Sequence, residues 1–361
     1  MIAKQPTSLN FAVLIFAWNE EQVIGDTIWN LREALRESDA LYVIADNCTD
    51  NTIGIARTSG AITVTRNSGK RRGKGAALSW FMKAYRRQML EFNYILILDA
   101  DSKVPGDLFE KLSQQISKDT QAAQCFLSPD GYIDHPLSTV ISLSEIIEQT
   151  VFDRIRSVLG FSVRLRGTGM LFRPQILIKL CPGIGTEVED IALSLLLADK
   201  KILVKQFNQV TIFDPKPVES TAASRQRARW FRGQWKALKD YLPIVVRLFL
   251  SGFRGWSVLG SLFHKPRWLK LLILIIAGLA LLKHPIFAAI FLSIAAIEIL
   301  MILFGIIALP NRTTFLRSLL YLPVFIVMWI KGIILSFKHR PWQRVRENKE
   351  ESYTTAFSRH P

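Results

Sequence analysis

The stretch Tyr94–Asp101, YILILDAD, decides the predicted fold, because five consecutive apolar residues lead directly into two aspartates one residue apart. A short apolar run of this kind is typical of a strand that is buried on both faces of a parallel sheet. Three earlier runs have the same character, namely Phe11–Ala17, Leu41–Ala45 and Ile62–Thr65. We therefore predict four buried parallel strands in the N-terminal part of the chain.

Helical patterns separate these strands. They cover Val23–Leu35, Thr52–Ser59 and Gly75–Phe92. Alternating strands and helices at this spacing predict right-handed crossovers and a doubly wound α/β sheet, and the alternation continues to about residue 205. In such sheets the ligand lies beyond the carboxyl ends of the strands.

Polar residues stand at those strand ends. Asn19 and Glu20 follow the first strand, Asp46 ends the second, and Asp99 and Asp101 follow the fourth. Carboxylates that converge on one edge of a sheet need a positive partner, such as a divalent cation and the diphosphate that it chelates. The pattern therefore predicts an enzyme that handles a nucleotide-sugar, with Mg²⁺ or Mn²⁺ held by Asp99 and Asp101.

The first two polar segments also have an ordinary structural interpretation. Asn19 could be the N-cap of the following helix, with the glutamates favoured by the helix dipole. The turn that begins at Asp46 is rich in Asp and Asn, as many turns are. The functional interpretation makes Glu20 a ribose ligand and Asp46 an acceptor for a base N–H. Both interpretations stay open at this point.

Two further segments belong to the predicted site. Lys74 lies between glycines at the start of a helix, where backbone N–H groups can bind a phosphate, although a solvated basic loop fits the same residues. Glu189 and Asp190 begin a leucine-rich helix, where acids complement the helix dipole. A carboxylate is also the group needed to deprotonate a hydroxyl acceptor, and this pair is the best remaining candidate.

The string Gln226–Trp230, QRARW, places Gln226, Arg229 and Trp230 on one face of a helix. An arginine binds phosphate oxygens with two hydrogen bonds, and an indole offers a flat surface to a sugar ring. The alternative is an amphipathic helix at a membrane surface, whose arginines extend toward water.

Positive charge is concentrated next to apolar sequence. Between Ser224 and Lys270 there are eleven Lys and Arg against the single acid Asp240, which is +10 of the formal +16. Such a block can bind nucleic acid or an anionic membrane. Because apolar runs follow at once, we predict membrane lipids and no nucleic acid as partners. The three scattered cysteines, Cys48, Cys125 and Cys181, are predicted to be reduced.

The membrane part is predicted to begin with interfacial helices over Arg232–His264. The apolar runs Trp268–Leu282 and Ile286–Pro310 are predicted to cross the membrane, the second being the stronger candidate. The third run, Leu319–Phe337, is predicted to lie in the interface or to re-enter, because the basic tail beyond it then stays in the cytosol. Glu298 stands in the middle of the second run. Because a carboxyl group in contact with lipid is energetically unfavourable, we expect its side chain to face protein.

Taken in order, these strings resemble the membrane-anchored family 2 glycosyltransferases of the GT-A fold. This group contains bacterial exopolysaccharide synthases, poly-N-acetylglucosamine synthase, hyaluronan and cellulose synthases and ceramide glucosyltransferase. The resemblance covers nearly the whole chain and rests on AWNEE, ADNCTD, RGKG, DAD, GTGMLFR, ED and QRARW, of which the Q-x-x-R-W string is the strongest marker.

The resemblance implies a role for each matching residue. The residues implied to bind the donor and its nucleotide are Ala17, Asn19, Glu20, Asp46, Lys74, Asp99, Gly167, Thr168, Gly169 and Glu189. Asp101 is implied to be the main metal ligand, beside Asp99, and Asp190 the general base. The residues implied to bind diphosphate or acceptor are Gln226, Arg229, Trp230, Trp342, Arg344 and Arg346, although Val345 stands where relatives of this kind usually have a threonine.

The combined expectation is a cytosolic GT-A domain with a doubly wound mixed sheet at residues 1–240, followed by interfacial helices, two to three membrane segments and a basic tail at residues 241–361. The expected activity is inverting transfer of a hexose or N-acetylhexosamine from a UDP-sugar to a carbohydrate or lipid hydroxyl at the plasma membrane. One alternative is a glycolipid synthase that adds a single sugar. The other is a non-catalytic membrane subunit that binds nucleotide or polymer.

Overall fold

The computed structural model describes residues 9–69, 73–129, 135–184, 188–217, 219–263, 266–307 and 316–337 of the chain. Contacts group the chain into two compact units, and each is described by itself. The first unit consists of Met1–Ser128, Asp153–Asp214 and Gly233–Phe263. The second consists of Pro129–Phe152, Pro215–Arg232 and His264–Pro361.

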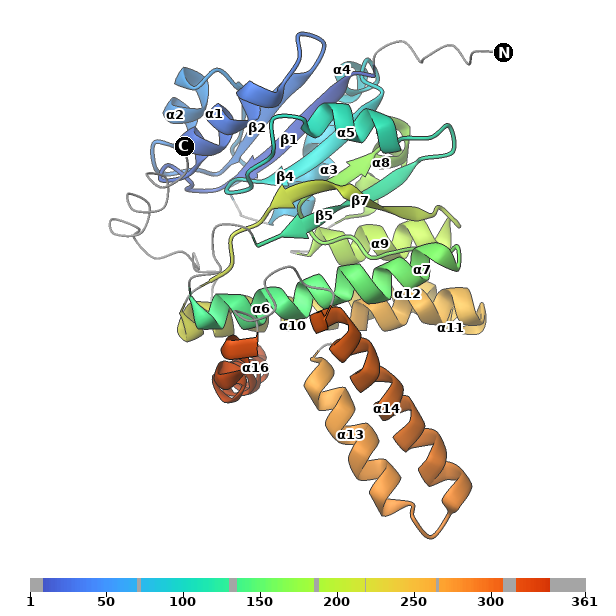
Figure 1. Cartoon of the computed structure of the whole chain (residues 1–361). Helices are drawn as coiled ribbons and strands as arrows, with labels where there is room; N and C mark the ends of the chain where they lie inside the picture. Colours follow the sequence, from blue (N-terminus) through green and yellow to red (C-terminus); the bar gives the residue numbers. More distant parts are fainter. Residues whose placement is uncertain are drawn as a thin grey trace. The chain divides into compact units, whose positions relative to one another are not determined.

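The first unit is built around a mixed sheet (Figure 1). Within the described residues its seven strands lie in the order β3-β2-β1-β4-β6-β5-β7. Their bounds are β1 Phe11–Ala17, β2 Ala40–Asp46, β3 Ile62–Arg66, β4 Tyr94–Asp99, β5 Ala122–Ser128, β6 Met170–Phe172 and β7 Val204–Phe213. The strands β1 to β4 pair in parallel, while β6 runs antiparallel to both β4 and β5. The predicted doubly wound mixed sheet is confirmed.

Helices cover both faces of this sheet. The helices of the first unit are α1 Ile24–Ala34, α2 Thr52–Thr58, α3 Lys74–Ala84, α4 Arg86–Met89, α5 Leu108–Gln115, α7 Arg154–Val158, α8 Pro174–Leu180, α9 Glu189–Asp199, α11 Leu242–Leu250 and α12 Phe253–Phe263. Alternate residues of β1 face opposite layers, as strand geometry requires. Val13 packs in the same cluster as α1 and α5, whereas Leu14 packs with α3, α8 and α9.

The four predicted strands form with shifts of one residue or less at their ends. The prediction that β3 is buried is wrong, because β3 lies at the edge of the sheet and Ile62 is 51% exposed. The predicted helix Gly75–Phe92 is wrong in its extent, because α3 ends at Ala84 and a separate short helix, α4, follows. At Tyr85, φ is −107° and ψ is 23°, outside the helical range. Met89, after this break, is fully buried in the core cluster on the α3 side of the sheet.

The segment predicted to lie at a membrane interface begins inside α10, Ser220–Asp240, and continues as α11 and α12. Leu248, Val258 and Leu262 pack with residues of α9. The opposite face leaves large apolar side chains in contact with solvent, among them Phe249 and Phe253, exposed by 61% and 77%. The helices α11 and α12 therefore have the amphipathic character that was predicted for this segment.

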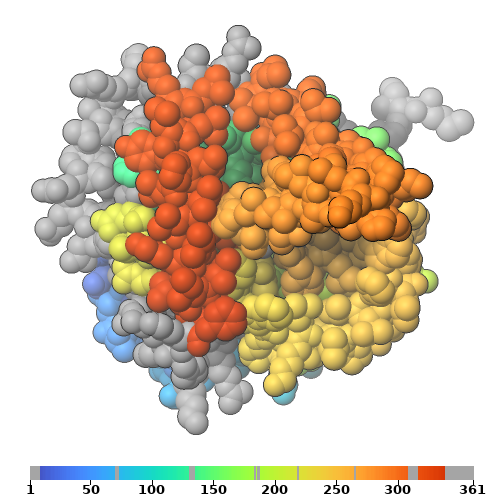
Figure 2. All heavy atoms as spheres, turned by 90° about the horizontal axis from the view of Figure 1, so that it is seen from below, coloured from blue at the N-terminus to red at the C-terminus, as the bar shows by residue number. Residues whose placement is uncertain are grey.

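The second unit is helical. It contains α6 Pro136–Ile147, most of a π-helical segment at Glu148–Asp153, the N-terminal part of α10, α13 Arg267–Ala280, α14 Pro285–Ile307, a 3₁₀ turn at Leu319–Tyr321 and α16 Leu322–Ser336. The helices α13 and α14 pack side by side as a hairpin (Figures 1 and 2). Gly278 permits this approach, because a Cβ there would lie 2.6 Å from Leu292.

Two described helices are long and apolar enough to cross a membrane, Pro285–Ile307 and Leu316–Ser336. The helix α13 has 14 residues, fewer than the roughly 20 that a crossing requires. Helix length therefore does not favour the predicted pair of crossings, Trp268–Leu282 and Ile286–Pro310. The segment Leu316–Ser336, which was predicted to lie in the interface or to re-enter, is long enough to cross, whereas α13 is not. Glu298 has the protein partner that its position demands: its Oε2 lies 2.5 Å from the Lys270 ammonium on α13.

Candidate active site

The predicted acidic edge of the sheet is assembled around Lys74, at the start of α3. The Lys74 ammonium lies 2.5 Å from Asp99 Oδ1, at the end of β4, and 3.5 Å from Glu189 Oε1, at the start of α9. It also donates a hydrogen bond of 2.8 Å to the carbonyl oxygen of Gly167. One cation thus joins four strings that are far apart in the sequence: RGKG, DAD, GTG and ED.

The charges at this edge shift one another's pKa values. Burial alone would lower the pKa of Lys74, but the carboxylates of Asp99, Glu189 and Asp190 outweigh it, so the pKa is raised. Burial raises the pKa of Glu189 to about 7, with Asp190 and Asp99 adding to the shift and Lys74 opposing it. Burial likewise raises the pKa of Asp190, against the charges of Arg164 and Lys74. A carboxylate with a raised pKa is suited to take up a proton near neutral pH.

The loop Gly167–Gly169 closes one side of this group of charges. Gly167 and Gly169 have φ of +88° and +66°, a conformation in which glycine carries no steric penalty. Between them, the hydroxyl oxygen of Thr168 accepts a 3.1 Å hydrogen bond from the Asp99 amide and lies 2.8 Å from the Ser102 hydroxyl. The predicted donor loop is therefore attached directly to the DAD string.

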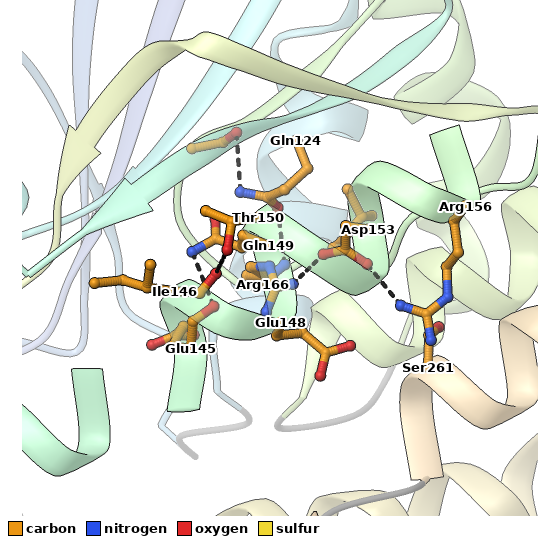
Figure 3. Close-up of polar contacts among 12 residues, drawn as sticks. Gln124, Glu145, Ile146, Glu148, Gln149, Thr150, Asp153, Arg156, Arg166 and Ser261 are labelled. Carbon is orange, nitrogen blue, oxygen red and sulfur yellow. Dashed lines mark hydrogen bonds and ion pairs between the residues drawn. The ribbon is translucent and has the colours of Figure 1, made fainter. Parts of the chain in front are cut away.

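Gln124, a buried residue of β5, bonds to this loop through its side-chain amide. Its Nε2 donates to the carbonyl oxygen of Thr168 at 2.9 Å, and its Oε1 accepts from the Arg166 amide at 2.9 Å. The Arg166 side chain pairs with Asp153, which also accepts a 2.8 Å bond from Arg156 (Figure 3). Sequence reasoning missed Gln124, although an amide within an otherwise apolar strand was a usable signal.

The end of the second strand is more crowded than predicted. Asp46 Oδ1 accepts hydrogen bonds from Arg66 at 2.6 Å and from Asn47 at 2.8 Å. Both Asp46 and Arg66 are buried. Arg66, the last residue of β3, was missed, and its signal was a single cation at the end of an otherwise uncharged strand. Whether Asp46 contacts a base stays a prediction.

Asn19 is not a helix cap, because α1 begins at Ile24 with Val23 at its N-cap position. Its side chain instead exchanges two hydrogen bonds with Thr49, at 2.8 and 3.0 Å. The Glu20 amide donates to the Thr52 hydroxyl at 2.7 Å. The loops that follow β1 and β2 are thereby joined at the predicted nucleotide-binding end of the sheet, immediately after the buried Ala17.

Asp101 follows β4 by two residues and is partly buried. In the parts of the chain that the structure describes, no group of three or more His, Cys, Asp and Glu side chains is arranged to hold a metal ion. Gln226, Arg229 and Trp230 lie on α10 in the second unit, and their share in the site stays a prediction. Trp342, Arg344 and Arg346 lie outside the described residues. The three cysteines are free thiols in the structure.

The fold and this edge define a doubly wound α/β domain with carboxylates, one lysine and a glycine loop at the carboxyl ends of its strands. The profile of the family described as Glycosyltransferase like family 2 matches residues 6–233, so the chain belongs to this family. Comparison with curated proteins gives no match.

Among solved structures, the chain is similar to a mannosyltransferase from Pyrobaculum calidifontis, determined in complex with GDP-Man and Mn²⁺. The identity is 16%, the TM-score is 0.47, and the match covers 90% of this chain and 88% of that one. It is also similar to glucosyl-3-phosphoglycerate synthase from Mycobacterium tuberculosis, in complex with phosphoglyceric acid. Here the identity is 17%, the TM-score is 0.42, and the match covers 64% of this chain and 80% of that one.

Proposed function

We propose that this family 2 glycosyltransferase moves a hexose or N-acetylhexosamine from a UDP-sugar to a carbohydrate or lipid hydroxyl, with inversion at the anomeric carbon. The observation that carries the proposal is the meeting of Lys74, Asp99, Gly167 and Glu189 at the carboxyl edge of the sheet. Charges of both signs at this edge suit a ligand that has a diphosphate at one end and hydroxyl groups at the other.

Asp190 is the proposed general base. It begins α9 beside Glu189, and the charges of Lys74 and Asp99 act on its pKa, which supports this role. Its raised pKa makes this carboxylate a stronger base, which can accept the proton of an acceptor hydroxyl. The deprotonated hydroxyl then attacks the anomeric carbon, and the bond from that carbon to the diphosphate oxygen breaks.

The carboxylates fit a hard divalent cation, for which oxygen ligands are preferred. Asp101, with Asp99 beside it, would hold Mg²⁺ or Mn²⁺, which when bound supplies positive charge to the departing diphosphate. Lys74 supplies a fixed cation from the protein, and Arg229 is proposed to supply another. The Gly167–Gly169 loop would lie against the donor sugar.

The proposed location is the cytosolic face of the plasma membrane. Two apolar helices, α14 and the segment Leu316–Ser336, support a membrane attachment, together with the exposed apolar face of α11 and α12. The proposed products are cell-surface or exopolysaccharide chains.

The test uses the full chain in purified membranes with a panel of radiolabelled UDP-sugars, Mn²⁺ and mass analysis of the product. We expect transfer from one UDP-sugar, and we expect Asp190→Asn to lower the rate by about a thousandfold or more while nucleotide binding is kept. The matched control is Asp107→Asn, which removes a carboxylate from an exposed surface pair and should keep full activity. Normal turnover by Asp190→Asn would remove this residue from the mechanism.

A further inference from the structure

The strongest unexplained feature outside the site is Arg227, on α10 in the second unit. This side chain is 2% exposed and is the largest fully buried side chain among the described residues. Its guanidinium carbon lies 5.5 Å from the ring centre of Trp230 and 5.1 Å from that of Trp329 on α16. Its Nη1 donates a 3.1 Å hydrogen bond to the Ala223 carbonyl of its own helix. Within the described residues its Nε has no hydrogen-bond partner.

The surroundings of Arg227 are apolar. The buried cluster beside it consists of Leu137, Val140, Ile141, Ala223, Phe325, Met328 and Trp329, with Phe231 and Trp268 packed against it. Gly332 brings α16 close to α10, because a Cβ there would lie 2.9 Å from the Cβ of Arg227. Burying a cation in such surroundings is unfavourable unless an opposite charge accompanies it.

No dedicated counter-ion is supplied by the described part of the unit. The acid that influences the pKa of Arg227 is Glu145, but Glu145 already lies 2.5 Å from the ammonium of Lys216. Glu148, the next buried acid on the same helical segment, pairs with Arg267. Burial lowers the pKa of Arg227 to about 9, so the group is still charged at neutral pH. Three cations thus share two carboxylates.

The unused polar groups near this cluster are N–H donors. Besides the Nε of Arg227, the buried indole nitrogens of Trp268 and Trp329 have no hydrogen-bond partner among the described residues. An arginine side chain and an indole N–H donate hydrogen bonds and accept none. A ligand that completes this cluster must therefore bring oxygen acceptors and negative charge. The helix that carries Trp329 also lies in a segment, Leu316–Ser336, that is apolar enough to cross a membrane, and its residues Val324, Val327 and Ile330 are exposed.

We propose that Arg227, with the indole N–H groups of Trp268 and Trp329, binds the phosphate group of an amphiphilic ligand, such as the head group of a phospholipid. Arginine forms charge-assisted bonds to phosphate oxygens, and the exposed residues Val324, Val327 and Ile330 of α16 would contact the acyl chains. The site goes beyond the proposed transfer reaction and does not depend on it, because neither a donor sugar nor Asp190 takes part.

The experiment measures lipid binding by native mass spectrometry of the full chain in detergent. The probes are palmitoyl-oleoyl phosphatidylglycerol, the diacylglycerol with the same acyl chains and no phosphate, and inorganic phosphate alone. We expect the phosphatidylglycerol to bind the natural chain, and Arg227→Gln to weaken this binding about tenfold or more. Arg225→Gln is the matched control, since it removes the same charge from an exposed position of the same helix.

The outcomes separate the sources of the phosphate. Preference for phosphatidylglycerol over the diacylglycerol, lost in Arg227→Gln and kept in Arg225→Gln, supports a lipid ligand. If the chain binds inorganic phosphate, and Arg227→Gln weakens that binding as much as it weakens lipid binding, the ligand of this site is a soluble phosphate. Equal binding of both probes by Arg227→Gln and the natural chain overturns the proposal.

A second variant keeps the proposal testable if Arg227→Gln fails to fold. Trp329→Phe retains the aromatic ring that stacks near Arg227 but removes the indole N–H. We expect it to fold and to bind phosphatidylglycerol several-fold more weakly than the natural chain does. Unchanged binding by this variant would contradict the assigned role of the indole.

Discussion

The two compact units differ in how a buried positive charge is paired. In the first unit, Lys74 has two carboxylate neighbours and a backbone carbonyl within 3.5 Å, so its charge is neutralised by the protein itself. In the second unit, Arg227 is more deeply buried, and Glu145, the acid whose charge acts on its pKa, is already paired with Lys216. The comparison teaches that the sheet edge is an assembled polar site, whereas the helical cluster has a positive charge that a ligand would balance.

The largest effect is expected when the cation is removed from the assembled site. Lys74→Met leaves the buried carboxylate of Glu189 and the partly exposed carboxylate of Asp99 without their common partner. We expect a loss of about 3 to 5 kcal/mol in the free energy of unfolding and at least a hundredfold loss of transfer activity. Thermal unfolding and turnover of the purified chain measure these two losses.

Lys111→Met is the matched control for this change. It breaks an exposed pair with Asp107, at 2.8 Å, and should alter stability by less than about 1 kcal/mol. If both lysine variants behave alike, the charges around Lys74 are not an assembled site and the contrast between the units fails.

A smaller effect is expected from the loop that carries Thr168. In Gly169→Ala the new methyl group would stand 3.1 to 3.3 Å from Ile212, Cys125 and Gln124, at a φ of +66°. We expect a cost of about 2 to 3 kcal/mol and a higher KM for the donor, because Thr168 is displaced from the Asp99 amide. Chemical unfolding and steady-state kinetics measure both.

The control for the loop variant is Gly106→Ala. A Cβ at Gly106 meets nothing within 4 Å, so stability and KM should stay unchanged. A Gly169→Ala enzyme with the natural KM and stability would show that the loop tolerates displacement and does not position the donor.

The smallest effect concerns the pH dependence of stability. Because burial raises the pKa of Glu189 from about 4.5 to about 7, the folded chain binds more protons than the unfolded chain between these values. This residue therefore makes stability fall as pH rises through that range, by about 1 to 2 kcal/mol between pH 5.5 and 7.5. Unfolding free energies measured across this interval should show a shallower fall for Glu189→Gln.

Glu110→Gln, at an exposed position of α5, provides the reference for the pH experiment and should keep the natural slope. If Glu189→Gln also keeps the natural slope, Glu189 is ionised throughout the range, and the balance of charges around Lys74 differs from the one described.

The sequence was sufficient to predict the strands that are buried on both faces. β1 and β4 are continuous apolar runs ended by polar residues, and this pattern is unambiguous. The strands β5, β6 and β7 were not assigned. β5 contains the buried Gln124, β6 has three residues, and β7 has partly exposed positions because it lies at the edge of the sheet. None of these carries a pattern that separates it from its surroundings.

The members of the site were more predictable than their partners. Asp99, Gly167 and Glu189 were named from their strings, and the structure brings them together at Lys74. The pairing itself was not predicted, since Lys74 was expected to act beside a phosphate-binding backbone. Distances between residues 25 to 115 positions apart depend on how strands and helices pack. For the same reason neither Arg66 nor the partner of Glu298 was foreseen.

The most direct test of the account is calorimetric titration of the full chain with UDP, with and without Mn²⁺. The account predicts that UDP binds at least tenfold more tightly with Mn²⁺ than in the presence of EDTA, and that Asp101→Asn removes this difference while Asp107→Asn keeps it. Equal UDP affinity with and without Mn²⁺, unchanged by Asp101→Asn, would contradict a chelated diphosphate at the acidic edge of the sheet.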